Sequence, residues 1–494
     1  MDFRDVQRQL RDSPIAFVTA DVPADVLTPA AILMRLNSDG RGPAFLLESV
    51  DRGQSVGRYS FVGSAPTEEI VLFQDGGWHR IGSRRHRITS GDLPALLRSR
   101  LPARSIPKGV APAIGLTGGW VGYFAYDVIR LWERLPSRAP DVLQQPWIHL
   151  GLYDRIVAVD HVCQTARAIA AVRPADSSRP GAVRAYEQSR RGLDRLVRCL
   201  GCPLTVSPLP PQAESVARSN MSRQEFSAAV AAMKSHIRRG DIFQGVLSQR
   251  WRVPSPRDAF AVYRRLRQSN PSPYMFFLRC DDLAIAGSSP ETLIQKNGNV
   301  VTTRPIAGTR PRGANLAEDL RREEQLRKSP KENAEHLMLV DLGRNDLGRV
   351  CRFGTVRTEP FRDIERFSHV LHMVSTVRGR IRPRIDAFDA LAAAFPAGTL
   401  TGAPKIRAME IIDALEPSRR GVYGGCVGYF DWGGNMDMAI AIRTVVMDKN
   451  AAYVQAGAGI VADSDADREF AETCSKAAAP LAAAGGVWNT KERR

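Results

Sequence analysis

Four glutamates occur in the chain as two pairs, and the two members of each pair are three residues apart. The first pair is Glu332 and Glu335 in SPKENAEHLMLVDL, and the second is Glu469 and Glu472 in DREFAETCSKAAA. On a helix, residues three apart share one face. Two such faces opposite each other would form an oxygen-rich site suited to Mg²⁺. Either pair alone is far more typical of a solvated helix surface.

Glu332 also has a purely local explanation. Ser329 stands where an N-cap would be, and Pro330 follows as the first helical residue. Glu332 is then the third helical residue, which is the position that completes a capping box. We therefore rank Glu332 below the other three glutamates as a metal ligand.

Further segments indicate anion binding. AGTLTGAPK (397–405) and QAGAGI (455–460) are glycine-rich and are predicted as loops whose N–H groups can approach a carboxylate, with a tight turn as the alternative. PIAGTRPRG (305–313) is predicted as a loop or turn on its prolines and glycines. MAIAIRTVV places Arg443 in an apolar strand, where a bidentate carboxylate partner would offset its burial. These features predict a Mg²⁺-dependent enzyme acting on a small carboxylate, without naming the reaction.

Composition restricts the class of protein. The 494 residues carry a formal charge of +17, which makes a basic nucleic-acid-binding protein the non-enzyme alternative, although no nucleic-acid-binding spacing is present. No apolar run approaches ~18 residues, and the N-terminus has no signal-like apolar region. The seven cysteines fit a reducing compartment, and the lone CxxC of Cys199 and Cys202 lacks a second pair for zinc. We expect a cytoplasmic protein without membrane or nucleic-acid partners.

A Pro/Ser-rich stretch divides the chain. We place a first part at 1–205, a linker at 206–219 and a second part at 220–494. The first part shows short strand-like runs with turn residues between them.

Local signals in the second part predict alternating helices and strands. Ser222 and Glu225 form a capping box for a helix that runs to about Arg239, and a strand follows within 242–253. The coarse class is mixed α and β with antiparallel hairpins.

The chain resembles the chorismate-utilising enzymes, most closely the anthranilate synthase component I family. In the second part the matching segments are SSPETLI, RPIAGTRPRG, ENAEHLMLVDLGRNDLGRV, HVLHMVSTVRG, GTLTGAPKIRAMEIIDALEP, YGGCVGYF, AIAIRT, QAGAGIVADS and EFAETCSKA. FLLESVDRG and GRYSFVG extend the resemblance into the first part, whereas residues 1–40 match poorly. It implies a large α/β (α+β) fold in which β-sheets from both parts form a sandwich with helices outside.

The resemblance implies an anthranilate synthase large subunit. Ammonia would add to chorismate at C2 with loss of the 4-hydroxyl, and pyruvate elimination would then give anthranilate, the first step of tryptophan biosynthesis. Mg²⁺ would bind the ring carboxylate at positions that match Glu335, Glu469 and Glu472, with Glu332 close by. The alternatives are a 2-amino-2-deoxyisochorismate synthase and an anthranilate synthase paralogue of specialised metabolism.

The resemblance also implies roles for individual residues. Glu291 matches the general acid that protonates the departing hydroxyl, a role that requires a carboxyl kept protonated by desolvation or neighbours. Residues that match the substrate-binding positions are Gly308, Thr399, Tyr423, Arg443, Gly457, Ala458 and Gly459.

Three positions distinguish this reaction from those of related enzymes. Gln244 stands where isochorismate and salicylate synthases carry a water-activating lysine, and glutamine cannot act as that base. Ala307 stands where aminodeoxychorismate synthases carry a nucleophilic lysine, so ammonia must attack directly. His372 matches a histidine that the family needs for efficient pyruvate elimination.

The family further implies feedback inhibition and a partner subunit. Tryptophan would bind in the first, regulatory part where it meets the second, at Glu48, Ser49, Pro273, Tyr274, Met275, Val427 and Tyr429. No glutaminase segment is recognised, and the chain ends soon after Glu472. We therefore expect ammonia to arrive free or from a glutamine amidotransferase subunit (anthranilate synthase component II).

Overall fold

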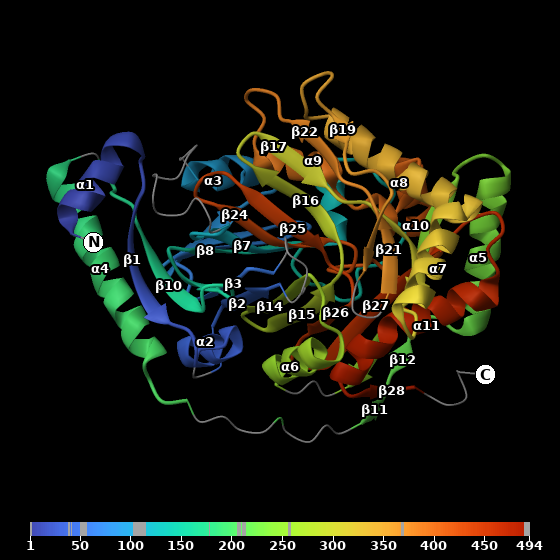
Figure 1. The fold of residues 1–494 in the computed structure, drawn as a ribbon, viewed down its shortest axis with the longest axis horizontal. Coiled ribbons are helices and arrows are strands. Elements are labelled where there is room, and N and C mark those ends of the chain that lie inside the picture. The colour runs from blue at the N-terminus through green and yellow to red at the C-terminus, as the bar shows by residue number, and fades with distance from the viewer. Residues whose placement is uncertain are drawn as a thin grey trace.

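Two large β-sheets dominate the computed structural model of the chain (Figure 1). The structure describes residues 2–37, 40, 42–49, 57–101, 115–176, 178–204, 209, 214–254, 258–366 and 370–488.

The first large sheet has twelve strands within the described residues, and all of its pairings are antiparallel. In spatial order the strands are β1 (Ala16–Pro23), β10 (Thr165–Val172), β9 (Arg155–Asp160), β3 (Tyr59–Ser64), β2 (Ala44–Glu48), β14 (Tyr274–Cys280), β15 (Leu283–Ser289), β26 (Thr444–Met447), β27 (Ala451–Ile460), β13 (Gln244–Pro254) and β12 (Arg218–Ser219), with β23 (Gly402–Ala403) also pairing with β13.

The second large sheet has eleven antiparallel strands within the described ranges. Their order is β19 (Arg357–Thr358), β22 (Val377–Arg380), β17 (Val300–Thr303), β16 (Thr292–Asn297), β25 (Met436–Ile440), β24 (Cys426–Asp431), β7 (Gly119–Phe124), β8 (Ile148–Tyr153), β4 (Glu68–Phe73), β5 (Gly76–Ile81) and β6 (Arg84–Ile88).

Two small sheets complete the strand inventory of the described chain. One consists of β18 (Ile306–Pro311), β21 (Val370–Val374) and β20 (Asp363–Arg366). The other pairs β11 (Ser215–Val216) with β28 (Gly486–Val487) in parallel.

Helices lie on the outside of the sheets. They are α1 (Phe3–Asp12), α2 (Pro29–Leu36), α3 (Leu93–Arg100), η1 (Tyr126–Leu131), α4 (Arg179–Leu200), α5 (Arg223–Arg238), α6 (Ala259–Ser269), α7 (Leu316–Lys328), α8 (Pro330–Gly348), α9 (Ala387–Ala394), η2 (Gly398–Leu400), α10 (Lys405–Leu415) and α11 (Ala466–Ala483). None of these described helices combines the length and the apolar character needed to cross a bilayer.

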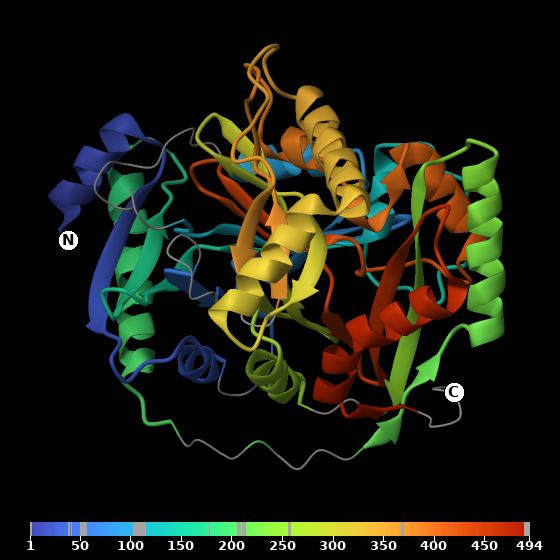
Figure 2. The same cartoon turned by 45° about the vertical axis from the view of Figure 1, so that its right-hand side comes forward.

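The predicted fold class is confirmed, because the two large sheets bury one common hydrophobic core. Phe45 and Phe276 of the first sheet belong to the same buried cluster as Trp120 and Leu150 of the second. Helix α4 covers β1 and β10 at one end of the molecule, and α5 and α11 lie at the other (Figure 1). Helices α7 and α8 pack on the small β18–β21–β20 sheet, in front of the large ones in Figure 2.

Both large sheets contain strands from either side of the predicted linker. Strand β2 pairs with β14 in the first sheet, and β7 pairs with β24 in the second. Of the predicted linker 206–219, residues 206–208 and 210–213 lie outside the described residues. Its last residues form β11 and β12, which pair with β28 and β13. The boundary at 206–219 stays a prediction.

The local signals for helix α5 are confirmed. Ser222 caps it, and the Glu225 side chain returns a bond to the Ser222 backbone. The predicted strand that follows is β13, which begins at Gln244. Buried Phe226, Val230 and Met233 form one stripe of the helix, so burial at helical spacing fixes its orientation.

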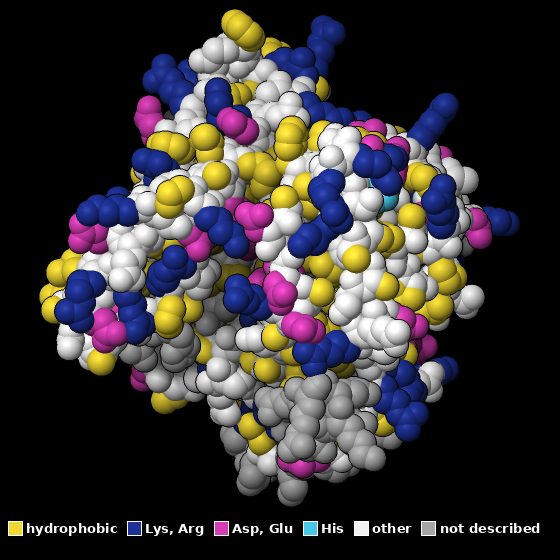
Figure 3. Space-filling model, turned by 90° about the vertical axis from the view of Figure 1, so that its right-hand side faces the viewer, with side chains coloured by type: hydrophobic (Ala, Val, Ile, Leu, Met, Phe, Trp, Pro, Cys, Tyr) yellow, Lys and Arg dark blue, Asp and Glu magenta, His cyan; other side chains and the backbone are white. Residues whose placement is uncertain are grey.

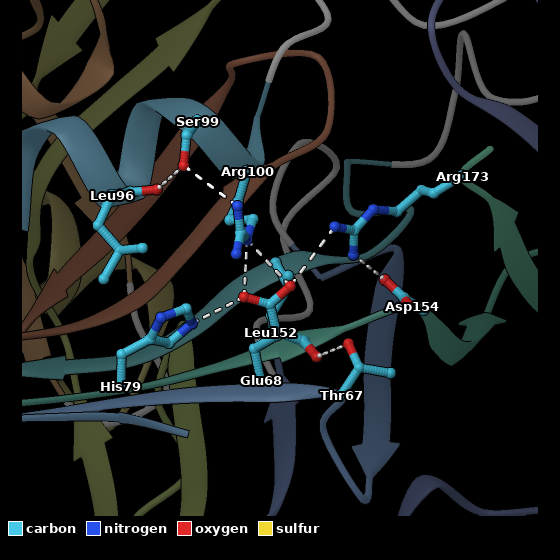
Figure 4. Close-up of polar contacts among 9 residues, drawn as sticks. All are labelled: Thr67, Glu68, His79, Leu96, Ser99, Arg100, Leu152, Asp154 and Arg173. Carbon is cyan, nitrogen blue, oxygen red and sulfur yellow. Dashed lines mark hydrogen bonds and ion pairs between the residues drawn. The ribbon is translucent and has the colours of Figure 1, made fainter. Parts of the chain in front are cut away.

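A buried polar cluster in the first part of the chain links β4 and β5 of the second sheet to α3 and to the end of β10 (Figure 4). The Glu68 carboxylate of β4 lies 2.7 Å from His79 Nε2 of β5 and accepts a 2.7 Å bond from Arg100 Nε at the end of α3. Arg173, just after β10, is 3.6 Å from the same carboxylate, and its guanidinium stacks 5.0 Å above the ring of Trp432. One buried carboxylate is thus compensated by groups from three elements, which joins them across the chain.

Candidate active site

The Glu291 carboxyl lies in the connection between β15 and β16, facing the turn η2. Thr399 Oγ1 in η2 donates a 2.9 Å hydrogen bond to Glu291 Oε1. Burial raises the pKa of Glu291 to about 7, and the Thr399 bond opposes that rise. A void of about 40 Å³ adjoins both residues. The segment 397–405, predicted as a loop or tight turn, takes the form of η2 followed by β23. A carboxyl with this pKa can both hold and release a proton near neutral pH.

The segment PIAGTRPRG is not simply a loop, because most of it, Ile306–Pro311, forms β18. A β-bulge lies between Ala307 and Thr309, and the bulged residue Gly308 has a φ of +68°. A Cβ there would also come 2.8 Å from Leu326 Cδ1, so only glycine fits without strain. The bulge accommodates a proline- and glycine-rich sequence within a sheet. It also turns the Gly308 carbonyl toward the neighbouring strand.

The ring of His372 in β21 is hydrogen-bonded to that carbonyl. Its Nδ1 lies 3.2 Å from Gly308 O and 3.1 Å from Thr309 Oγ1. Burial, with a smaller contribution from the charge of Arg443, lowers the pKa of His372. The imidazole is therefore neutral near pH 7. Ala307 is buried next to the bulge and pairs with Met373, the residue after His372.

The predicted glycine-rich loop at 455–460 is wrong, since these residues are the end of strand β27. They pair with β13 through register partners such as Val246 with Gly459. Ala458 is fully buried in this ladder. The glycines serve close packing, because a Cβ at Gly459 would come 2.7 Å from Gln244 Nε2. Within the described chain, no partner lies within hydrogen-bonding distance of the buried Gln244 Oε1.

Tyr423 and Arg443 lie beside the same strand. A Cβ at Gly457 would come 2.8 Å from the Tyr423 hydroxyl. The prediction that Arg443 lies inside a strand is wrong. The residue lies in the turn between β25 and β26, with a φ of +51°. Its Nη1 donates to the carbonyl of Lys476, and no carboxylate of the described residues forms an ion pair with it. Burial lowers its pKa.

Lys476 is a site residue that the sequence analysis missed. Its Nζ donates a 3.0 Å bond to Gly457 O and forms a 2.6 Å ion pair with Glu472, one turn earlier on α11. Its charge also lowers the pKa of Glu291, as the smallest of the three influences on that group. The sequence could have indicated Lys476, because it follows Glu472 by four residues and such a pair shares one helical face.

The two glutamate pairs lie on α8 and α11, as predicted. Burial raises the pKa of Glu335, and so do the negative charges of Glu332 and Glu472. Burial likewise raises the pKa of Glu469, with Glu472 adding to the rise. Carboxylates on α8 and α11 therefore repel one another, which is the electrostatic environment that a cation relieves. Figure 3, which views the face at the right of Figure 1, shows acidic side chains around a central hollow among Lys and Arg.

Glu332 is paired with a residue outside α8 and α11. Ser329 caps its backbone N–H, as predicted, but its carboxylate accepts a 2.9 Å bond from Arg310. Among the described residues, no three acidic, His or Cys side chains lie close enough together to hold a metal ion as they stand. The carboxylates of α8 and α11 suit only a cation that takes few protein ligands, with substrate and solvent oxygens as the rest.

A second cavity, of about 1190 Å³, opens between the two large sheets. Its lining includes all seven residues predicted to bind an inhibitor: Glu48, Ser49, Pro273, Tyr274, Met275, Val427 and Tyr429.

The polar groups of this cleft are partly engaged with one another. The buried Glu48 carboxylate accepts bonds from the Tyr263 hydroxyl and from Arg267 Nε, the latter at 2.9 Å. Tyr274 OH lies 2.8 Å from Thr292 Oγ1, the residue after Glu291. Among the described residues, nothing bonds to the buried Ser49 Oγ. The cleft thus offers a carboxylate, a hydroxyl and apolar walls.

A family model described as chorismate binding enzyme matches residues 42–482, which include every residue of the two sites above. The chain belongs to this family. Anthranilate synthase component 1 of Mycolicibacterium smegmatis is 44% identical to this chorismate-binding enzyme over 97% of the chain and 92% of the relative. The protein of that name from Acetivibrio thermocellus is 40% identical, with 97% of each covered.

Solved structures of the family show the same fold. Anthranilate synthase component I from Streptococcus pneumoniae superposes with a TM-score of 0.76 at 33% identity, covering 93% of this chain and 99% of that one. The menaquinone-specific isochorismate synthase of Escherichia coli superposes with a TM-score of 0.69 at 18% identity, covering 97% and 99%. The second likeness shows the fold alone.

Proposed function

We propose that this chorismate-binding enzyme is an anthranilate synthase large subunit. It aminates chorismate at C2 with ammonia, expels the 4-hydroxyl as water, and eliminates pyruvate to leave anthranilate. The observation that carries the proposal is the Glu291–Thr399 pair, a carboxyl with a pKa near 7 within a chain that matches proteins of this name over 97% of its length.

Glu291 acts as the general acid. The departing hydroxyl leaves as water only if a proton reaches it as the C–O bond breaks. A carboxyl with an ordinary pKa would be almost fully ionised at neutral pH, whereas burial raises the pKa of Glu291 to about 7, so the protonated form is populated there. The Thr399 hydroxyl fixes Oε1, so the proton lies on the other oxygen, Oε2, available to the substrate.

His372 acts in the second half of the reaction. Removal of the C2 proton and departure of the enolpyruvyl group as pyruvate make the ring aromatic. Because Gly308 O accepts from Nδ1, the lone pair of the neutral ring is on Nε2, which can take that proton. Arg443, Tyr423 and the Gly457 backbone would hold a substrate carboxylate, which the closeness of the Tyr423 hydroxyl to Gly457 supports.

Glu335, Glu469 and Glu472 would hold Mg²⁺. When bound, the ion would neutralise the ring carboxylate and withdraw electron density from the ring. The support is the mutual repulsion of these carboxylates across α8 and α11. Glu332 is paired with Arg310, so it would lie close to the ion without binding it directly.

Gln244 and Ala307 favour ammonia over other nucleophiles. The Gln244 amide has no basic group to activate water, and Ala307 carries no amine to attack C2. A 2-amino-2-deoxyisochorismate synthase would share both residues, so it remains the alternative that product analysis must separate.

We further propose that tryptophan inhibits the enzyme from the cleft between the sheets. Glu48 would attract its amine, and Met275 with Val427 would border its indole ring. Ammonia would be supplied in the cytoplasm by a separate component II subunit, which the component 1 names of the relatives support.

The deciding experiment is product analysis. Incubation with chorismate, Mg²⁺ and an ammonium salt at mildly alkaline pH should give fluorescent anthranilate and pyruvate in equal amounts. Accumulation of a non-fluorescent amino-dihydro acid would establish the amino-deoxyisochorismate reaction instead. No chorismate turnover, together with tight and steeply salt-dependent nucleic-acid binding, would support the non-enzyme alternative.

A further inference from the structure

The position of the Thr399 hydroxyl depends on a short segment between two helices. Helix α9 ends at Ala394, α10 begins at Lys405, and Thr399 lies midway in the turn η2. Thr399 in turn donates the bond to Glu291. Any change in the separation of the two helix ends therefore moves the hydroxyl that holds the reacting carboxyl.

Lys405 joins the two ends of that segment. Its Nζ donates a 3.1 Å bond to Ala394 O, the last carbonyl of α9. It also donates to Asp346 of α8, at 3.0 Å to Oδ1 and 2.9 Å to Oδ2. An ammonium group has three donors, and these three bonds use all of them. The two side chains are only 11% and 10% exposed, so water competes little for these bonds.

Asp346 also borders the void beside Glu291. The residues around this void include Asp346, Ala394, Gly398 and Thr399 as well as Glu291. At about 40 Å³ it is far too small for the substrate. Asp346 thus borders the same void as the reacting carboxyl, and it carries Lys405 through their ion pair.

We propose that Lys405 and Asp346 are positioning residues that hold Thr399 against Glu291 by fixing both ends of the segment 394–405. This inference rests on the proposed general-acid role of Glu291. Breaking the pair loosens η2 and weakens the Thr399–Glu291 hydrogen bond. The effect reaches the reaction only through that bond.

A purely structural ion pair would also destabilise the fold when broken, so stability does not distinguish the two roles. The proton affinity of Glu291 does. The Thr399 bond lowers the pKa of Glu291, so loss of the bond raises it. The acid form then persists to higher pH, and the basic limb of the kcat profile moves upward.

The test compares Thr399→Val, Lys405→Met and the double variant by their pH profiles of kcat and by KM for chorismate. The control is Arg130→Met, which removes the ion pair between Arg130 and Asp413 near the other end of α10. That pair is similarly buried, with side chains 12% and 5% exposed.

We expect Lys405→Met to lower kcat by about 10- to 100-fold with KM changed less than about threefold, as for a misplaced catalytic group. Its basic limb should move upward as in Thr399→Val, and the double variant should equal Thr399→Val alone. Arg130→Met should lower Tm and leave the profile in place. An unmoved limb in Lys405→Met, or multiplicative losses in the double variant, would overturn the proposal.

Asp346→Asn provides a second, milder variant that keeps the side-chain volume. It should shift the basic limb of the kcat profile to higher pH, as Lys405→Met does. If the lysine variant does not fold, Asp346→Asn tests the proposal by itself. If the unaltered protein forms no anthranilate, the proposed function fails. If it does, and Asp346→Asn leaves the profile unmoved, only this inference fails.

Discussion

The carbonyl oxygen of Gly308 lies 3.2 Å from Nδ1 of His372. A carbonyl oxygen can only accept, so Nδ1 carries the ring proton and Nε2 carries the lone pair. The β-bulge at Gly308 produces this contact, because it shifts the register between β18 and β21. A backbone irregularity thus selects the tautomer of a side chain on the neighbouring strand.

His372→Met should separate the two halves of the reaction. Methionine has a similar volume but cannot accept a proton from C2, so amination continues while pyruvate loss falls by roughly 10²-fold or more. Chromatography should show an amino-dihydro acid in place of anthranilate. Thr309→Val is the control, since it removes the hydroxyl near Nδ1 and leaves the Gly308 carbonyl. An unchanged anthranilate yield in His372→Met would contradict the assignment.

Glu291→Gln should retain chorismate binding and lose about 10²–10⁴-fold in kcat, the usual worth of a general acid. In the unaltered enzyme the protonated carboxyl is the active form. With a pKa of about 7, kcat should be high below that pH and fall as pH rises through it. Steady-state kinetics from pH 5.5 to about pH 9 would measure both effects. A variant with near-normal kcat would remove Glu291 from this role.

The same substitution should change how stability depends on pH. Burial raises the pKa of Glu291 from 4.5 to about 7 in the folded protein. The protonated group is tolerated below pH 4.5, and stability is lost as the group ionises between pH 4.5 and 7. Glutamine does not ionise, so Glu291→Gln should raise Tm relative to the unaltered protein more at pH 8 than at pH 4.5.

Glu324→Gln is the control for that measurement. Glu324 is exposed, and the hydrogen bond from Lys328 lowers its pKa. The Tm difference for this variant should therefore be small and of opposite sign. Equal Tm differences for Glu291→Gln at both pH values would mean that the pKa of Glu291 is not raised in the folded protein.

Helical spacing predicted the parts of the site that lie on helices. Glu332 and Glu335, like Glu469 and Glu472, are three residues apart, which places each pair on one helix face, and a helix is encoded by residues close together in sequence. That α8 and α11 bring their acids within range of each other was implied by the family resemblance and not by either segment alone.

The strand-borne parts of the site were harder to predict, because their structure depends on distant partners. QAGAGI reads as a loop in isolation, yet β13 supplies the ladder that makes it a strand. Gly459 packs against the side chain of Gln244, and a contact between residues so far apart in sequence cannot be predicted from the residues around either one. Arg443 reads as strand, although a positive φ places it in the turn between two strands.

Glu335→Gln should raise the Mg²⁺ concentration for half-maximal activity by about 10-fold or more, since a carboxylate ligand is lost. Glu332→Gln is the matched control three residues earlier on the same helix. Its carboxylate is already paired with Arg310, so its effect on Mg²⁺ dependence should be smaller. Titrating activity with Mg²⁺ after chelation measures both. If Glu332→Gln raises the Mg²⁺ concentration for half-maximal activity more than Glu335→Gln does, Glu332 is the more important of the two ligands.

Glu48→Gln should weaken inhibition by tryptophan without lowering kcat, because Glu48 lies in the cleft between the sheets and not beside Glu291. Loss of a charge-assisted hydrogen bond to the amine, worth roughly 1.5–3 kcal/mol, raises the inhibition constant about 10-fold or more. Tyr263→Phe is the control, since it removes one hydroxyl donor to Glu48 but leaves the carboxylate charge. Inhibition assays at fixed chorismate would compare the two. If Tyr263→Phe weakens inhibition as much as Glu48→Gln does, the shape of the cleft and not the charge of Glu48 governs binding.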